Sequence, residues 1–192
     1  MKIIKIVLLN LCLNFGVVGM FQISEASIPT KAIKPNPRSI VFNNQYPLEA
    51  RWDAYHQIVT KNKKESLPMA HKAVKSKDWF LREAGLKTFV ALKPEQAKVI
   101  ARDMLEKDPS MLVRAQALSA IKILDDKTSE KLLWKTLKDP KNFRGDQSLW
   151  IRPKVVATLM EFKMGNKEQF KGLLDDKDPQ VQRLAQEALK KF

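Results

Sequence analysis

The sequence predicts an all-α protein in which about four helix-turn-helix units follow one leading helix. Three observations predict it. Four segments of the 192-residue chain align in one register, an Asp precedes each of them, and a second, shorter apolar pattern lies upstream of each Asp. In both patterns the apolar residues recur with the spacing of one helix face. Repeats of this kind are better evidence for a fold than any single motif.

Residues 1–26 have the pattern of a secretory signal peptide. Lys2 and Lys5 precede a run without charge from Ile6 to Ser24, and Ser24 and Ala26 place small residues three and one positions before a cut between Ala26 and Ser27. Signal peptides have this order of a basic region, an apolar region and a small-residue cleavage site. The alternative is an uncleaved membrane anchor. We expect cleavage, and therefore an exported chain, periplasmic or secreted and suggestive of a bacterial envelope, with no remaining transmembrane span.

Residues 27–47 form the next predicted segment, an extended arm. Proline removes a backbone donor and disfavours helix at the residue before it, and the segment has few residues suited to a core. The alternative is a basic arm that docks on an anionic partner or folds over the first helix. The prolines and the basic residues are Pro29, Pro35, Pro37, Pro47, Lys31, Lys34 and Arg38.

Residues 48–192 contain the helical units, beginning with a leading helix. Its apolar residues Leu48, Trp52, Tyr55 and Val59 are spaced four, three and four apart. This spacing places them on one helix face. We expect this helix to cap the open N-terminal end of the units that follow.

The four aligned segments predict the second helix of each unit. Their first residues are 32, 38 and 30 positions apart. The first and ninth positions hold large apolar residues, while the fifth and eighth hold mostly small ones, which let another helix come close. The segments are Leu81–Phe89, Val113–Ile121, Ile151–Leu159 and Val181–Leu189.

An Asp before each segment marks the start of that helix. Asp accepts hydrogen bonds from first-turn N–H groups, and Pro, which follows in three of the four cases, is tolerated there. The upstream patterns at 67–75, 94–107, 129–138 and 167–175 predict the first helix of each unit. One helix pair cannot bury its apolar face alone, so neighbouring units must stack.

The order Asp-Pro, aliphatic-Arg and then Ala-x-x-Ala-Leu resembles HEAT repeats, in the short form called bilin-lyase-type HEAT-like repeats. The resemblance covers about residues 66–192. It implies a right-handed α-α superhelix, a solenoid, whose usual role is a curved platform for protein–protein contacts. The chain departs from the family at Gln182, where the family has Arg, and at Pro153, early in its helix.

The resemblance also implies a ladder along the solenoid, in which the Arg of each unit reaches the Asp of a neighbouring turn. The alternative for these arginines is an exposed basic row that binds an anionic partner. The residues of the implied ladder are Asp78, Arg82, Asp108, Arg114, Asp139, Arg152, Asp178 and Arg183.

Residues 141–150 are an insertion in the third unit, and they contain the candidate binding site. Insertions in repeats form loops on one edge, often the working edge, and exposed aromatic residues beside cations are typical of interaction hot spots. The alternative is that both aromatics fold back onto the core, as we expect for the other tryptophans, including Trp79. The candidate binding residues are Lys141, Phe143, Arg144, Trp150 and Lys154.

The composition limits the function classes. With two His, one Cys and six Gly, the chain offers no catalytic constellation, no Cys-based metal site and no Gly-rich phosphate loop. We expect a non-enzymatic scaffold that binds another protein and carries no cofactor and no metal. The net charge of +14 supports the alternative of a basic protein that binds an anionic glycan or a membrane surface. A lyase-like or DNA-base-excising HEAT enzyme ranks third, because export separates the chain from genomic DNA and disfavours nucleic acid.

Overall fold

The computed structural model describes residues 35–192, which contain ten α-helices, two short 3₁₀ helices and one two-stranded hairpin. The described part of the chain is therefore all-α, as predicted. The predicted signal peptide at 1–26 and the first part of the arm, 27–34, lie outside the described residues. The helices are α1 (Pro37–Val41), α2 (Leu48–Lys61), α3 (Lys63–Ala73), α4 (Trp79–Leu92), α5 (Pro94–Lys107), α6 (Met111–Ile123), α7 (Glu130–Lys138), α8 (Ile151–Glu161), α9 (Lys167–Lys171) and α10 (Pro179–Leu189), with 3₁₀ helices at Lys127–Ser129 and Pro140–Asn142 and strands β1 (Phe143–Arg144) and β2 (Gln147–Ser148).

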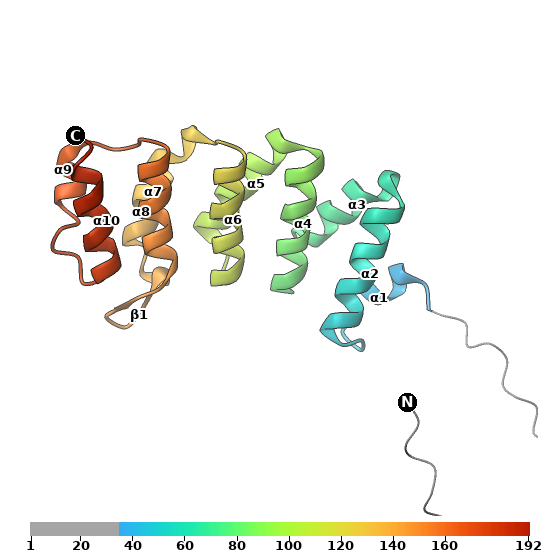
Figure 1. Ribbon diagram of the computed structural model, residues 1–192. Coiled ribbons are helices and arrows are strands. Elements are labelled where there is room, and N and C mark those ends of the chain that lie inside the picture. Colours follow the sequence, from blue (N-terminus) through green and yellow to red (C-terminus); the bar gives the residue numbers. More distant parts are fainter. Residues whose placement is uncertain (1–34) are drawn as a thin grey trace, which may run out of the picture. The chain divides into compact units, whose positions relative to one another are not determined.

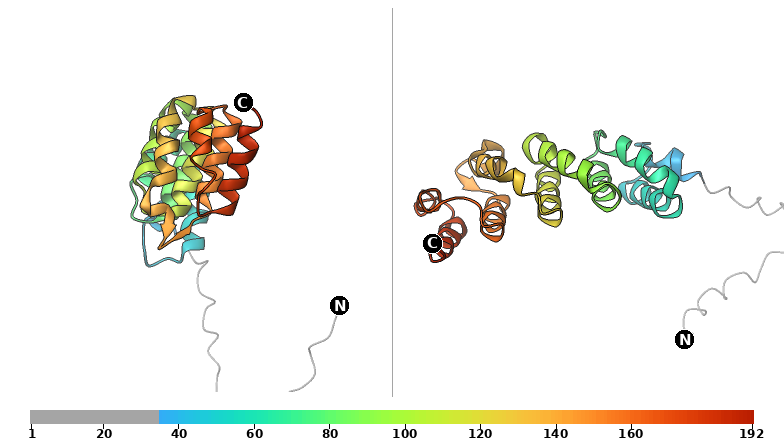
Figure 2. Two further views of the ribbon diagram at one scale, coloured as in Figure 1. Left: turned by 90° about the vertical axis from the view of Figure 1, so that its left-hand side faces the viewer. Right: turned by 90° about the horizontal axis from the view of Figure 1, so that it is seen from above.

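Helices α2, α4, α6, α8 and α10 stand side by side in one layer, and α3, α5, α7 and α9 form a second layer behind them (Figure 1). In the view from above, most helices of both layers are seen nearly along their axes (Figure 2). Each even-numbered helix from α4 to α10 packs against the odd-numbered helix before it and against its even-numbered neighbours. The four helix pairs expected from the sequence are therefore present as α3–α4, α5–α6, α7–α8 and α9–α10.

All turns that lead from an odd-numbered helix into the next even-numbered helix lie at one edge of the two layers, the lower edge in Figure 1. We call this edge the turn edge. It carries the hairpin β1–β2, which lies between α7 and α8. The N-terminal ends of all the even-numbered helices meet there.

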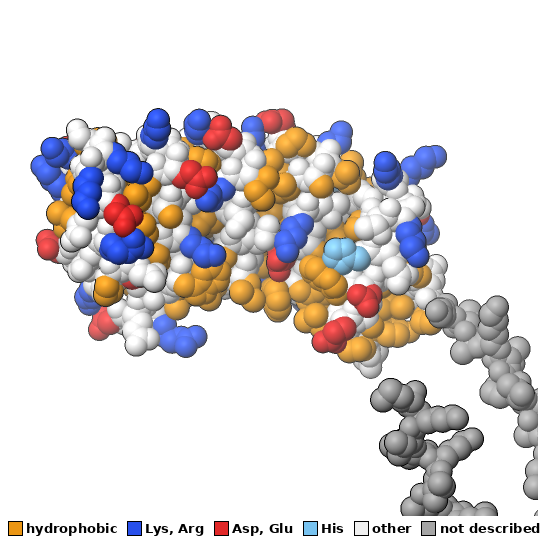
Figure 3. Space-filling model, in the orientation of Figure 1, with side chains coloured by type: hydrophobic (Ala, Val, Ile, Leu, Met, Phe, Trp, Pro, Cys, Tyr) orange, Lys and Arg blue, Asp and Glu red, His pale blue; other side chains and the backbone are white. Residues whose placement is uncertain are grey.

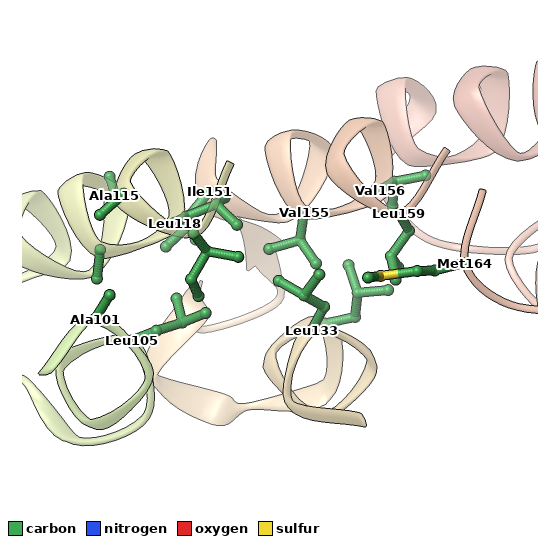
Figure 4. Close-up of a cluster of buried hydrophobic side chains, with 14 of the residues drawn as sticks. Ala101, Leu105, Ala115, Leu118, Leu133, Ile151, Val155, Val156, Leu159 and Met164 are labelled. Atoms are coloured by element: carbon green, nitrogen blue, oxygen red, sulfur yellow. The ribbon is translucent and has the colours of Figure 1, made fainter. Parts of the chain in front are cut away.

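A continuous hydrophobic core runs from α4 to α10 between the two layers. Leu105, Leu118, Leu133 and Val155 come from four successive helices and interdigitate (Figure 4), and each is at most 2% exposed. A second cluster joins α1, α2 and the start of α4 at the N-terminal end, with Tyr55 at its centre. The apolar faces that no single helix pair can bury are thus buried between neighbours.

The small fifth position of the first aligned segment permits close packing of α3 on α4. A Cβ atom on Gly85 would lie 2.8 Å from Val74 Cγ1 and 3.0 Å from the carbonyl oxygen of Ala70. These distances are shorter than ordinary van der Waals contact. Only glycine fits this helix crossing without a shift of α3.

The prediction of an extended arm is wrong for residues 35–47, which include helix α1. The side chain of Asn36 accepts a hydrogen bond from the backbone N–H of Arg38, and Pro37 occupies the first helical position, where proline costs no hydrogen bond. Val41 is fully buried against α2 and Tyr55. The helical domain therefore begins near residue 35, not at 48, because a cap and a buried side chain outweigh the proline content.

Residues 35–192 contain neither a long apolar helix nor a cluster of metal-binding side chains. No helix there combines the length and the hydropathy needed to cross a membrane. No group of three or more His, Cys, Asp or Glu side chains in the same range is placed to hold a metal ion.

Candidate functional site

A row of polar side chains, one from each even-numbered helix, lies just behind the turn edge. We call it the Arg row. Each member reaches a turn at this edge: Arg51 pairs with Asp78, Arg82 donates two hydrogen bonds of 2.7 and 2.8 Å to Asp108, and Arg152 forms a pair of hydrogen bonds with Asp176. The row consists of Arg51, Arg82, Arg114, Arg152 and Gln182, the last of which donates to the carbonyl of Asp176.

The central member, Arg114, has no carboxylate partner within residues 35–192. Its guanidinium donates to Asn142 Oδ1 at 3.0 and 3.2 Å and to the carbonyl oxygens of Asp108 and Lys141, each at 2.9 Å. Arg114 is only 2% exposed, and this burial lowers the pKa of Arg114, although the charges of Asp139 and Asp108 act in the opposite direction. A neutral amide and main-chain oxygens therefore hold a buried cation at this point.

Burial alone would raise the pKa of Asp176, but hydrogen bonds from Arg152 and the Asp178 backbone, with the charge of Arg152, lower it below its ordinary value. The pKa of Asp126, in the turn before α7, is lowered in the same way. Burial opposes the shift there, while hydrogen bonds from Thr128 and Ser129 and the charge and hydrogen bond of Arg102 outweigh it. Both carboxylates are therefore held ionised by partners within the fold.

Three expected members of the ladder lie elsewhere. Asp139 accepts a hydrogen bond from the backbone N–H of Lys141, and Asp178 accepts one from Gln180. A carboxylate at a helix start binds first-turn N–H groups, so the Arg of the preceding unit meets a different residue, Asn142 or Asp176. Arg183 is exposed and pairs with Glu187 on its own helix.

Sequence reasoning missed three members of these interactions: Arg51, Asn142 and Asp176. A signal existed for Asp176, because Asp176 and Asp178 repeat the spacing of Asp108 and Ser110. Since the four Arg side chains are engaged inside the fold, they do not form an open basic row.

The insertion in the third unit forms a short hairpin, with Phe143 paired to Ser148 and Arg144 paired to Gln147. Gly145 begins its two-residue loop with a φ of 58°, which glycine adopts without strain. At the base of the hairpin the N–H of Leu149 donates to the carbonyl of Asn142, 2.9 Å away. Asn142 thus ties the insertion to Arg114 of the preceding unit.

The five candidate binding residues divide into two groups. Phe143 is partly buried beneath the Arg152 guanidinium, 4.4 Å from the ring centroid, and Lys141 donates to the Glu106 carbonyl at 2.5 Å. These two hold the insertion in place. Trp150 is 40% exposed, with Lys154 Nζ 4.6 Å from its ring centroid, and Arg144 is exposed on β1. These three remain available to a partner.

Trp150 is also the last member of a row of exposed large apolar side chains along the turn edge. Each member stands two or three residues before the Arg row residue of its own helix. The expectation that Trp79 lies in the core is wrong, because this residue is the first of α4 and 38% exposed. We call these four residues the apolar row: Leu48, Trp79, Leu112 and Trp150, which are 42, 38, 47 and 40% exposed. Hydrophobic surface gathers along this lower edge in Figure 3.

Two grooves lie away from the turn edge. One, of about 290 Å³, lies between α2 and α4 and is lined mainly by apolar side chains, including Trp52 and Leu92. The other, of about 450 Å³, lies between α7 and α9 beside Trp134. The two histidines pack edge-on against aromatic rings, His56 against Trp52 and His71 against Phe89, and neither has a carboxylate partner among the described residues.

Comparison of the chain with family models, with curated proteins and with solved structures finds no match.

Proposed function

We propose that this chain is a non-enzymatic scaffold that binds another protein along its turn edge. The apolar row carries the proposal. Four large exposed apolar side chains stand at corresponding helix starts along one edge, whereas singly scattered exposed apolar residues need no explanation. Two of the four are tryptophans, which are enriched among the residues that dominate binding energy.

The architecture we propose for this scaffold is a right-handed α-α superhelix of HEAT-like units, extending over residues 35–192. The Arg row supports it, since each member from Arg51 to Arg152 bonds to the turn of the following unit. Stacking of this kind places corresponding residues of successive units along one edge. A platform with a repeated binding edge follows from that arrangement.

A photo-cross-linking experiment tests the proposed function. A benzophenone amino acid replaces Leu112, in the apolar row, or Ile123, which is 68% exposed at the other end of α6. We expect irradiation of cells that make the full chain to give a discrete protein adduct from position 112 and none from position 123. Equal labelling at both positions, or none at 112, would contradict a binding edge.

We also propose that the chain is exported, on the basis of the signal pattern in residues 1–26. N-terminal sequencing of the protein recovered outside the cytoplasm is expected to begin at Ser27. Recovery of the protein with residues 1–26 attached would indicate an anchor instead.

Binding to an anionic glycan or membrane surface is the alternative, and the engaged Arg row weakens it. Charge-driven binding falls steeply as salt rises. Retention of the chain on heparin into high salt, without the position-specific adduct at 112, would favour this alternative over a protein partner.

A further inference from the structure

We infer that the partner segment is an acidic, amphipathic α-helix of another protein, which lies along the apolar row with its apolar residues about seven apart. The inference rests on the proposed function, and it specifies the chemistry of the partner. Three features of the turn edge carry it: the exposed apolar row, the unequal use of its charges and the repeat of its helix ends.

The acidic and basic side chains of the turn edge differ in whether they have bonding partners within the fold. Most of its carboxylates are engaged within the fold: Asp78, Asp108 and Asp176 bind the Arg row, and Asp146 pairs with Lys177 at 3.1 Å. Asp139 and Asp178 accept hydrogen bonds from backbone N–H groups, while Asp175, in the turn before α10, is exposed.

The cations beside the apolar row are not engaged in this way. Lys77, Arg144 and Lys154 are exposed, and none of them lies within 4 Å of a carboxylate among the described residues. Among the described residues, two acidic side chains of the edge are likewise exposed without a cation within 4 Å: Glu49 on α2 and Asp175 before α10, at the two ends of the edge. An apolar surface flanked by free cations favours a partner that carries carboxylates beside its apolar residues.

Trp150 and Lys154 show how one such contact would work. They stand one turn apart at the start of α8, and the ammonium lies over the indole ring at 4.6 Å. A partner side chain that covers the exposed part of the ring would lose water there, while a carboxylate one turn away on the partner would reach Lys154. Apolar burial and ion pairing would then strengthen each other, because the ion pair would form at a partly desolvated site.

The repeat of the helix ends sets the spacing on the partner. Packed helices lie about 8–10 Å apart, so Trp79, Leu112 and Trp150, at the starts of the neighbouring helices α4, α6 and α8, recur at about that interval. An α-helix rises about 1.5 Å per residue, and about five to seven residues therefore span it. Residues seven apart also return to nearly the same face of a helix, so one apolar stripe can meet several members of the row.

A peptide-selection experiment tests the inference. The full chain is used to select from a phage-displayed library of random linear peptides of about 24 residues, which is long enough for three such intervals. We expect the selected peptides to be enriched in Asp and Glu, to carry large apolar residues about seven apart, and to gain helical circular dichroism on binding. Trp79→Ala and Trp150→Ala should each weaken binding about tenfold or more, and Lys154→Glu should weaken it more at low salt than at high salt.

Ile123→Ala is the matched control, an exposed apolar truncation away from the turn edge, and it should leave binding unchanged. Selected peptides that lack acidic enrichment, that show the alternating apolar spacing of a strand, or that bind Trp150→Ala as well as the parent chain would overturn the inference. If such a result is obtained but the cross-linked adduct at position 112 is found, only the inference is contradicted and the proposed function is retained. If the adduct is absent as well, both the inference and the proposed function are contradicted.

Discussion

Arg114 shows how one residue joins two units. Its guanidinium donates no hydrogen bond to a carboxylate of the described residues; instead it donates to Asn142 and to three main-chain carbonyl oxygens, two from its own unit and one from the next. A buried cation of this kind depends on all of its acceptors, because each unpaired buried polar group is costly. The side chain is therefore a structural tie and not a binding residue.

Arg114→Ala is expected to lower the free energy of unfolding by about 2–4 kcal/mol, because it leaves Asn142 and buried carbonyls without donors and opens a cavity. Arg144→Ala, which removes an exposed guanidinium on the hairpin, should change it by less than about 0.5 kcal/mol. Urea unfolding followed by circular dichroism measures both. Equal effects would show that Arg114 does not join the units.

The lowered pKa of Asp176 makes part of the stability depend on pH. A carboxyl group whose pKa is lower in the folded state stabilises the fold above its unfolded pKa, and that stabilisation is lost as pH falls through the folded pKa. We therefore expect the free energy of unfolding to decrease below about pH 4. Asp176→Asn should be less stable at neutral pH and show a shallower decrease in acid, and urea unfolding at a series of pH values measures both effects.

At the scale of secondary-structure elements, the hairpin and helix α3 are positioned by small, specific contacts. Asn142 fixes the base of the hairpin and thereby the position from which Trp150 emerges. Gly85 fixes the distance of α3 from α4. Neither residue would touch a partner, yet both determine where exposed groups lie.

Gly85→Ala and Gly172→Ala form a matched pair that tests the helix contact. A methyl group at Gly85 meets the backbone of α3, so we expect a loss of about 1–3 kcal/mol in the free energy of unfolding. At Gly172 the nearest atoms are 3.5 Å or more away, and alanine restricts the unfolded chain, so a gain of about 0.4–1 kcal/mol is expected. Destabilisation by Gly172→Ala together with a neutral Gly85→Ala would contradict this account of the packing.

The sequence was a good guide to the helices and a partial guide to the site. Periodicity located all four helix pairs, because a buried helix face requires apolar residues at regular intervals in the sequence. It did not locate α1, whose five residues are too few for a period, or Arg51, because α2 lacks the Asp-Pro start of the later units. The identity of the Arg114 partner depends on how the insertion folds, and no local pattern encodes that. Trp150 was found through its insertion, while Leu112 looked like an ordinary first-turn residue.

At the scale of the described domain, packing is less complete at the N-terminal end than in the middle. Helix α2 packs on α1 and α3, but a groove separates much of it from α4. Helix α6 instead lies in the middle of the continuous core, with seven buried residues.

We expect backbone amides of α2 to exchange with deuterium faster than those of α6, since segments with fewer buried contacts open at lower free energy. Hydrogen exchange with mass spectrometry, corrected for intrinsic rates, measures the difference. Comparable protection of both helices would mean that the groove between α2 and α4 does not weaken the N-terminal end.

The bonding of each Arg of the row to the turn of the following unit has an evolutionary consequence. Each of the first three units provides a cation to the unit that follows it and an acceptor to the helix that precedes it, so its two ends are complementary. Duplication in tandem of one unit, such as residues 94–126, would therefore create a junction resembling those already in use. Growth or shortening of the chain by whole units is the change that this construction tolerates best, and each added unit would lengthen the apolar row by one side chain.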